Sequence, residues 1–295
     1  MVVALCVAAV AVARWWRASS VYDAARLISA LPTERATVVY LDIEQLRRSG
    51  LLTLLAGSKA AEEPDYRKFV DETGFDYRTD LDALAAAFVD GRFYATLRGR
   101  FRWRQLTAYA ESQGGECHYS VCTMIGSTVE RNISFYPLKS DVLALAVSTD
   151  PQAVTVIGTG AKAKMPVPRE PFWISLPAAA FDRVEAFPAG TRAFLSPLAH
   201  AEKVTFAAGP QGDHLQLRLE VACATPEAAA ELVMQLSNVT GLLKSMIDRE
   251  HMTPNPRDLS GVLVAGTFAQ RQSTVIGTWP VERGFVEALA SGQIQ

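Results

Sequence analysis

The sequence predicts an α+β fold of two related subdomains, each a mainly antiparallel sheet with helices packed on one face, after a short N-terminal apolar segment. Apolar and polar residues alternate with the two-residue period of a β-strand over residues 93–102 and again over 215–221. Turn residues precede both runs, as Asp90-Gly91 in the first and as residues 209–213 in the second. Helical spacing of apolar residues follows both runs. The chain therefore contains a hairpin-then-helix unit twice.

The segments around the two units also match in pattern. Each unit has a strand-like run followed by a helix-like segment before it, and another such pair after it. For the first unit these pairs are 37–41 with 42–55 and 142–147 with 150–157. For the second unit they are 172–176 with 177–184 and 274–279 with 281–289. We therefore predict an internal duplication, with a first repeat over residues 18–157 and a second over 172–295. Residues 158–171 are rich in Gly, Lys and Pro without apolar period, which is typical of a linker.

Composition narrows the class of protein. The chain has 295 residues, of which 49% are hydrophobic, so it can form an ample core. Its formal net charge of −2 does not favour binding to a polyanion, and we expect no nucleic-acid partner. Four cysteines are an ordinary number for a chain of this length, and they exclude a disulfide-framed miniprotein.

The N-terminal residues 2–13 are uninterrupted and apolar, and Arg14 and Arg17 then bracket two tryptophans. The run is shorter than the roughly 20 residues that span a bilayer, although its length suits the core of a signal peptide. No basic segment precedes it, and the arginines follow it, which favours a cytoplasmic C-terminal side. A buried strand or helix is the alternative. We predict a membrane anchor or export signal over residues 1–17, with a natural start upstream and the globular part in the cell envelope.

The first repeat is predicted to open with a helix within residues 18–31. The strand 37–41 has no alternation, which is expected of a strand covered on both faces. The amphipathic helix after it is interrupted at Gly50, and residues 62–75 form an acidic, polar helix. The remaining elements are a helix at 103–110 and strands at 117–125, 132–138 and 143–147.

The second repeat has a clear helix start. Thr225 is a suitable N-cap, and Pro226 stands at the first helical position, where its missing N–H costs nothing. The apolar stripe after it extends to Leu236. Residues 248–259 are polar, carry two prolines and are predicted to be irregular.

Basic and aromatic residues interleave after the first hairpin. Such a strip can bind phosphates while its rings stack on bases, or it can lie against anionic headgroups. The alternative is a solvated strand face, because the arginines share the parity of Thr96. The candidate ligand-binding residues are Arg98, Arg100, Arg102, Trp103 and Arg104.

Cys117 and Cys122 stand on either side of four residues. In a hairpin with a four-residue loop they oppose each other, so a disulfide is the first choice and free thiols the second. A metal site is the weakest alternative, because His118 is the only further ligand nearby and no second Cys/His pair occurs elsewhere. We predict no metal and no cofactor.

The sequence contains no His-Glu-x-x-His, Gly-x-Ser-x-Gly or P-loop motif. The leading hypothesis is a non-enzymatic, membrane-anchored protein of the cell envelope that binds a protein partner or helps to assemble a complex. The alternative is an enzyme or small-ligand-binding protein with a cleft between the two repeats. Titratable side chains converging in one apolar pocket would favour this alternative.

Overall fold

The computed structural model describes residues 23–56, 63–126, 131–159, 165–181, 194–212, 214–251 and 253–290, together with residues 128 and 192. The predicted N-terminal anchor at residues 1–17 lies outside this part of the chain. The strands are β1 (Thr37–Asp42), β2 (Leu81–Val89), β3 (Arg92–Gly99), β4 (Glu116–His118), β5 (Val121–Ile125), β6 (Asn132–Lys139), β7 (Val142–Ser148), β8 (Phe172–Pro177), β9 (Lys203–Gln211), β10 (His214–Ala222), β11 (Thr267–Arg271) and β12 (Thr274–Val281).

Helices stand between and beside these strands. The α-helices are α2 (Ala24–Ser29), α3 (Ile43–Arg48), α4 (Leu51–Ala56), α6 (Pro64–Thr73), α7 (Tyr77–Asp80), α8 (Trp103–Ser112), α10 (Pro226–Arg249), α11 (Leu259–Val264) and α12 (Arg283–Ala290). The 3-10 helices are η1 (Ala153–Val156), η2 (Ala178–Phe181) and η4 (Ser196–His200).

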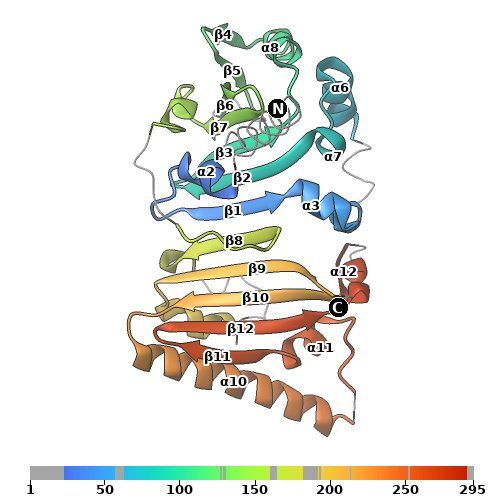
Figure 1. The fold of residues 1–295 in the computed structure, drawn as a ribbon, viewed down its shortest axis with the longest axis vertical. Coiled ribbons are helices and arrows are strands. Elements are labelled where there is room, and N and C mark those ends of the chain that lie inside the picture. The colour runs from blue at the N-terminus through green and yellow to red at the C-terminus, as the bar shows by residue number, and fades with distance from the viewer. Residues whose placement is uncertain are drawn as a thin grey trace, which may run out of the picture.

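All twelve strands belong to one antiparallel sheet in the order β11-β12-β10-β9-β8-β1-β2-β3-β7-β6-β5-β4 (Figure 1). The prediction of two separate sheets is therefore wrong. The strands that open the two halves, β1 and β8, pair with each other and join the halves edge to edge. Tyr40 stands opposite Trp173 in this pairing, and their rings stack with centroids 5.8 Å apart. Trp173 is fully buried, so the seam is part of the core.

The order of strands outward from the seam is the same in both halves. It is β1-β2-β3-β7-β6 on one side and β8-β9-β10-β12-β11 on the other. A helix follows the third strand in each half, α8 after β3 and α10 after β10. The first half has two further strands, β5 and β4, at its outer edge.

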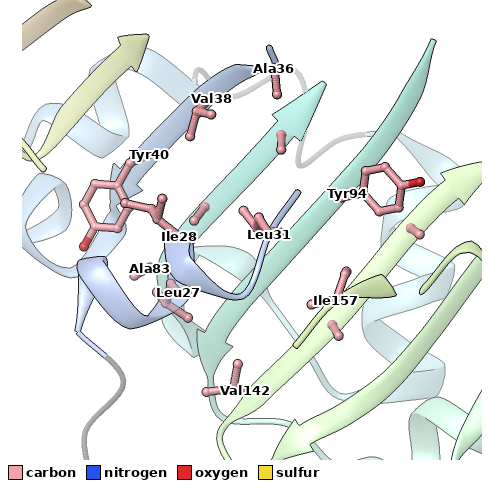
Figure 2. Packing of buried hydrophobic residues seen from close by; sticks show 14 of the residues in the cluster. Leu27, Ile28, Leu31, Ala36, Val38, Tyr40, Ala83, Tyr94, Val142 and Ile157 are labelled. Atoms are coloured by element: carbon pink, nitrogen blue, oxygen red, sulfur yellow. The ribbon is translucent and has the colours of Figure 1, made fainter. Parts of the chain in front are cut away.

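Helices cover both faces of the sheet in the first half, so the prediction of helices on a single face is wrong there. On one face, Leu27 and Ile28 of α2 pack over the small side chains of Ala83 and Ala85 (Figure 2). The hydroxyl of Thr96 on this face donates to the Leu27 carbonyl oxygen at 3.0 Å. The opposite face is covered by α8 and α6, whose apolar side chains join two further buried clusters. Such cover on both faces explains the continuous apolar runs of the strands.

In the second half, β10 and β12 bury one face, whereas β8 and β9 at the seam also bury Trp173 and Ala207 on the other face. Leu232 and Leu236 of α10 pack with Leu219 and Val221 of β10, on the face that also receives α11 and α12. The register places Arg218 and Glu220 on the opposite face, in line with Ala207 and Trp173. Ala229 of α10 and Val262 of α11 join the same cluster as Leu236, whereas Ile247, near the end of α10, is buried outside it.

Local signals in the sequence place several elements correctly. Asp90 and Gly91 have φ of 50° and 73° and form the two-residue turn between β2 and β3, as predicted. Gly50, with φ of 74°, separates α3 from α4. The Thr225 side chain accepts a hydrogen bond from the Ala228 N–H and caps α10. This helix has 24 residues and continues well beyond the predicted end of the apolar stripe.

Candidate functional site

The predicted basic strip is not one continuous strand. β3 ends at Gly99, because the chain approaches Asp80 so closely there that a Cβ would meet the Asp80 carbonyl oxygen. Arg102 is instead the N-cap residue of α8. The alternation expected through residue 102 therefore stops three residues early, and the strip divides between a strand, a loop and a helix.

The first arginines of the strip contact the protein itself. Arg98 lies on the face that α2 covers, where its charge partly offsets the burial that raises the pKa of Asp82. Arg100 donates to the Thr79 carbonyl oxygen and forms an ion pair with Asp80 at 3.1 Å. The Arg102 guanidinium lies against Gly74, whose φ of 64° ends α6.

The last two residues of the strip differ from each other. The Trp103 Nε1–H donates to the Ser140 carbonyl oxygen at 2.9 Å, and its ring packs on Phe101. Arg104 is exposed and forms no hydrogen bond or ion pair with a residue that the structure describes. Ligand binding by the five residues stays a prediction, and Arg104 is the member best placed for it.

Cys117 and Cys122 are cross-strand partners in the β4–β5 hairpin and form a disulfide, with Cα atoms 4.1 Å apart. The loop is shorter than the four residues predicted, because His118 also pairs with Val121. Tyr119 stands at the tip with φ of 58° and is fully exposed. The oxidised state of this pair in the exported protein stays a prediction.

An apolar cavity of about 300 Å³ lies in the first half, between the sheet and the helices α6 and α8. We call it the first cavity. It is lined by Phe69, Phe75, Leu97, Phe101, Leu106, Tyr109, Met124, Ile133, Phe135, Leu143 and Leu145. These side chains come from both helices and from β3, β5, β6 and β7.

A second apolar cavity, of about 220 Å³, lies in the other half beneath α10 and α11. We call it the second cavity. Its lining is Phe194, Leu195, Leu198, Phe206, Leu217, Leu219, Leu236, Leu259, Val262, Leu263, Trp279, Val281 and Phe285. The indole N–H of Trp279 is buried and has no hydrogen-bond partner among the described residues.

Neither lining contains a carboxylate, an amine, an imidazole or a thiol. The Tyr109 hydroxyl and the Trp279 indole N–H are the two polar side-chain groups of the lining residues. The Tyr109 hydroxyl is the one titratable side-chain group among the lining residues of the two cavities. Their chemistry suits uptake of an apolar molecule.

A polar groove opens beside the first cavity, between α6 and α8. It is lined by Glu72, Arg104, Gln105, Ala108, Tyr109 and Ser112. Glu72 has a counter-ion on its own helix, because Lys68 Nζ lies 3.9 Å from its Oε1. Partial burial and the nearby carboxylates of Glu72 and Asp65 raise the pKa of Tyr109.

Neither cavity could be predicted from the sequence. Apolar spacing predicts which residues face the core, but it does not predict whether the opposing side chains fill the space between them. Both cavities lie inside a half, whereas the alternative hypothesis expected a cleft between the repeats. No three His, Cys, Asp or Glu residues of the described chain are grouped to hold a metal ion.

Comparison with known proteins relates the fold to solved structures. No family model and no curated protein matches the sequence. Crystal form I of TP0453 is similar in fold, with a TM-score of 0.51 and 11% identity, over 90% of this chain and 95% of that one. Crystal form III of TP0453 has a TM-score of 0.49 at 10% identity and covers the same share of this chain. At such low identity the likeness is one of fold alone, namely a mixed fold of helices with a large antiparallel sheet.

No helix in the described part of the chain is both long and apolar enough to cross a membrane. The predicted anchor at residues 1–17 does not belong to that part.

Proposed function

We propose that this chain is a non-enzymatic binding protein of the cell envelope, anchored by residues 2–13, that takes up apolar small molecules in its two cavities. The observation that carries the proposal is the chemistry of the linings, which are apolar side chains throughout except for one hydroxyl and one indole N–H. Apolar cavities of about 150 Å³ already bind benzene-sized molecules, and both cavities here are larger.

The binding test uses the neutral fluorophore N-phenyl-1-naphthylamine, whose emission rises in an apolar site. Leu145→Phe should fill part of the first cavity and Leu217→Phe part of the second, because these half-buried strand residues line them. Each variant should remove one class of sites, and the double variant should remove both. Leu138→Phe is the matched control, since Leu138 is half-buried against the cluster beneath α2, on the other side of the sheet. Wild-type protein that does not bind the fluorophore would overturn the proposal.

The location is tested separately. Cells expressing the full reading frame should carry the protein in the membrane fraction, and protease added to spheroplasts should degrade it. A soluble protein protected from protease would remove both the anchor and the envelope role.

Binding of a protein partner is the second candidate, and the surface of α10 favours it. Leu242 and Met246 are 64% and 52% exposed and lie one helical turn apart. Large apolar side chains grouped in this way are typical of contact surfaces. A photo-crosslinking residue in place of Leu242 should capture a partner in cells, whereas the same residue in place of the exposed Ser237 should not. Equal capture at both positions would remove this candidate.

We also infer that the two halves arose by duplication of one unit. The common order of strands outward from the seam supports this inference, as does the helix that follows the third strand in each half. Superposition of residues 36–157 on 172–290 along a common path is the test, together with sequence profiles of relatives of each half. Profiles that align the halves out of strand register would overturn the inference.

A further inference from the structure

The first cavity and the polar groove meet at one side chain. Tyr109 of α8 lines both the apolar space above the sheet and the groove between α6 and α8. The cavity supplies only apolar contacts apart from the Tyr109 hydroxyl, while the groove supplies a guanidinium, a carboxylate, an amide and hydroxyl groups. A ligand that filled both spaces would need an apolar chain and a polar head.

The charges of the groove favour an anionic head. Glu72 is engaged by Lys68, one turn earlier on the same helix. Arg104 projects from α8 into the same groove and has no partner in the described part of the chain. A guanidinium presents several N–H donors in a planar fork that matches a carboxylate. Gln105 stands beside it and can add an amide donor.

We propose that the first cavity and its groove together bind a single-chain anionic amphiphile, with the apolar chain in the cavity and a carboxylate head at Arg104. This assignment rests on the proposed function, because it requires that the first cavity take up an apolar chain. It assigns a specific role to one member of the basic strip. Arg100 and Trp103 instead donate to backbone carbonyl groups of the protein, and the Arg102 guanidinium lies against Gly74.

The test compares three ligands that share one chain, namely decanoate, decanol and decylammonium, by calorimetry below their micelle concentrations. Wild-type protein should bind decanoate more tightly than decanol, and decanol more tightly than decylammonium. Arg104→Gln should weaken the binding of decanoate roughly three- to tenfold, which is the effect of losing one partly exposed charge-assisted contact. The same substitution should change the affinity for decanol less than about twofold. Arg104→Lys should restore part of the loss.

Two variants serve as references for this test. Arg271→Gln is the matched control, because Arg271 is exposed on β11 at the other end of the sheet and should change nothing. Leu145→Phe should weaken decanoate and decanol alike, which shows that both chains occupy the first cavity.

The outcomes separate the two proposals. Equal affinities for decanoate and decanol, or an Arg104→Gln protein that binds decanoate normally, would overturn the head-group assignment while uptake of an apolar chain stands. Tighter binding of decylammonium would overturn it as well, in favour of Glu72 as the selecting group. If no ligand binds, or if Leu145→Phe weakens the binding of none of them, both the assignment and the proposed function of this cavity would be overturned.

Discussion

The two halves share an order of strands but differ in what their sheets carry on the face of Trp173. In the first half this face is lined by alanines, among them Ala85 of β2, the strand on which α2 packs, and Ala144 of β7, the strand on which η1 packs. In the second half the same face carries Arg218 and Glu220, which form an ion pair with each other. Small apolar side chains allow a helix backbone to approach, whereas charged ones keep a face in water. The choice of side chain on one face thus decides whether a sheet becomes the middle layer or an outer surface.

The largest expected effect comes from placing a charge at matched positions of the two faces. Ala144 of β7 is opposite Thr96, and Ile276 of β12 is opposite Glu220, so both residues lie on the fourth strand outward from the seam and on the face of Trp173. Ala144→Arg buries an unpaired charge in the cluster beside η1 and should reduce the free energy of unfolding by about 3–5 kcal/mol. Ile276→Arg should cost about 1 kcal/mol or less, because that half-buried side chain can reach solvent.

Urea unfolding followed by circular dichroism measures both variants. Ala144→Leu is the control for volume, since it overfills the same place without a charge and should cost about 1–3 kcal/mol. Similar losses for the two arginine variants would show that the two faces are covered alike.

The second effect concerns the hairpin that only the first half has at its outer edge. Replacing Cys117 and Cys122 together by serine should lower the free energy of unfolding by about 2 kcal/mol or less, because the bridge closes a very short loop. Without reductant, thiol labelling of the unfolded exported protein should leave both cysteines unmodified, while Cys223 reacts. Full labelling of the pair would remove the disulfide and weaken the case for an oxidising compartment.

The sequence predicts well what depends on neighbouring residues and poorly what depends on distant ones. The turn at Asp90-Gly91, the break at Gly50 and the cap at Thr225 all follow from local chemistry, and the structure has them. The pairing of β1 with β8 joins residues far apart along the chain, and no local pattern distinguishes one shared sheet from two. The pairing of Cys117 with Cys122 could be predicted from the sequence because both residues lie in one hairpin.

The candidate site shows the same difference between what the sequence predicts and what depends on distant residues. Arg104 belongs to the predicted basic strip, but its difference from Arg100 depends on which carbonyl and carboxylate groups the folded loops bring close. The cavities depend on the exact fit between helices and sheet. Hydrophobic spacing carries no information about a void of this size.

The third effect is a pH dependence confined to the α6–α7 corner of the first half. Asp76 caps α7, accepts from the Tyr66 hydroxyl at 2.9 Å and pairs with Arg78. The hydrogen bond from Arg78 is the main reason why the pKa of Asp76 falls to about 2, from an ordinary value of 3.8. A carboxyl whose pKa is lower in the folded state stabilises the fold above its unfolded pKa and loses that contribution as pH falls.

We therefore expect wild-type protein to lose about 1–2 kcal/mol of unfolding free energy between pH 4 and pH 2 that Asp76→Asn does not lose. The measurement is urea unfolding of both proteins at several pH values across this range. Asp71→Asn on α6 is the control, because Asp71 is exposed and serves as no helix cap. Parallel curves for wild type and Asp76→Asn would show that the corner contributes nothing through this charge.

The smallest effect is expected on the second-half face. Glu170 Oε1 lies 3.1 Å from Arg218 Nη1, and Arg218 is held at the same time by Glu220. Because Arg218 keeps a second carboxylate partner and its side chain is 36% exposed, Glu170→Gln should reduce the free energy of unfolding by about 1 kcal/mol or less. The loss should shrink further in 1 M salt, since solvated ion pairs are screened. Unfolding in low and high salt measures it, with Glu202→Gln as the exposed control on the same half. A salt-independent loss of more than about 2 kcal/mol would mean that Glu170 and Arg218 are shielded from water. The contrast between a covered first half and an open second half would then be wrong at this position, and the segment before β8 would count as part of the cover.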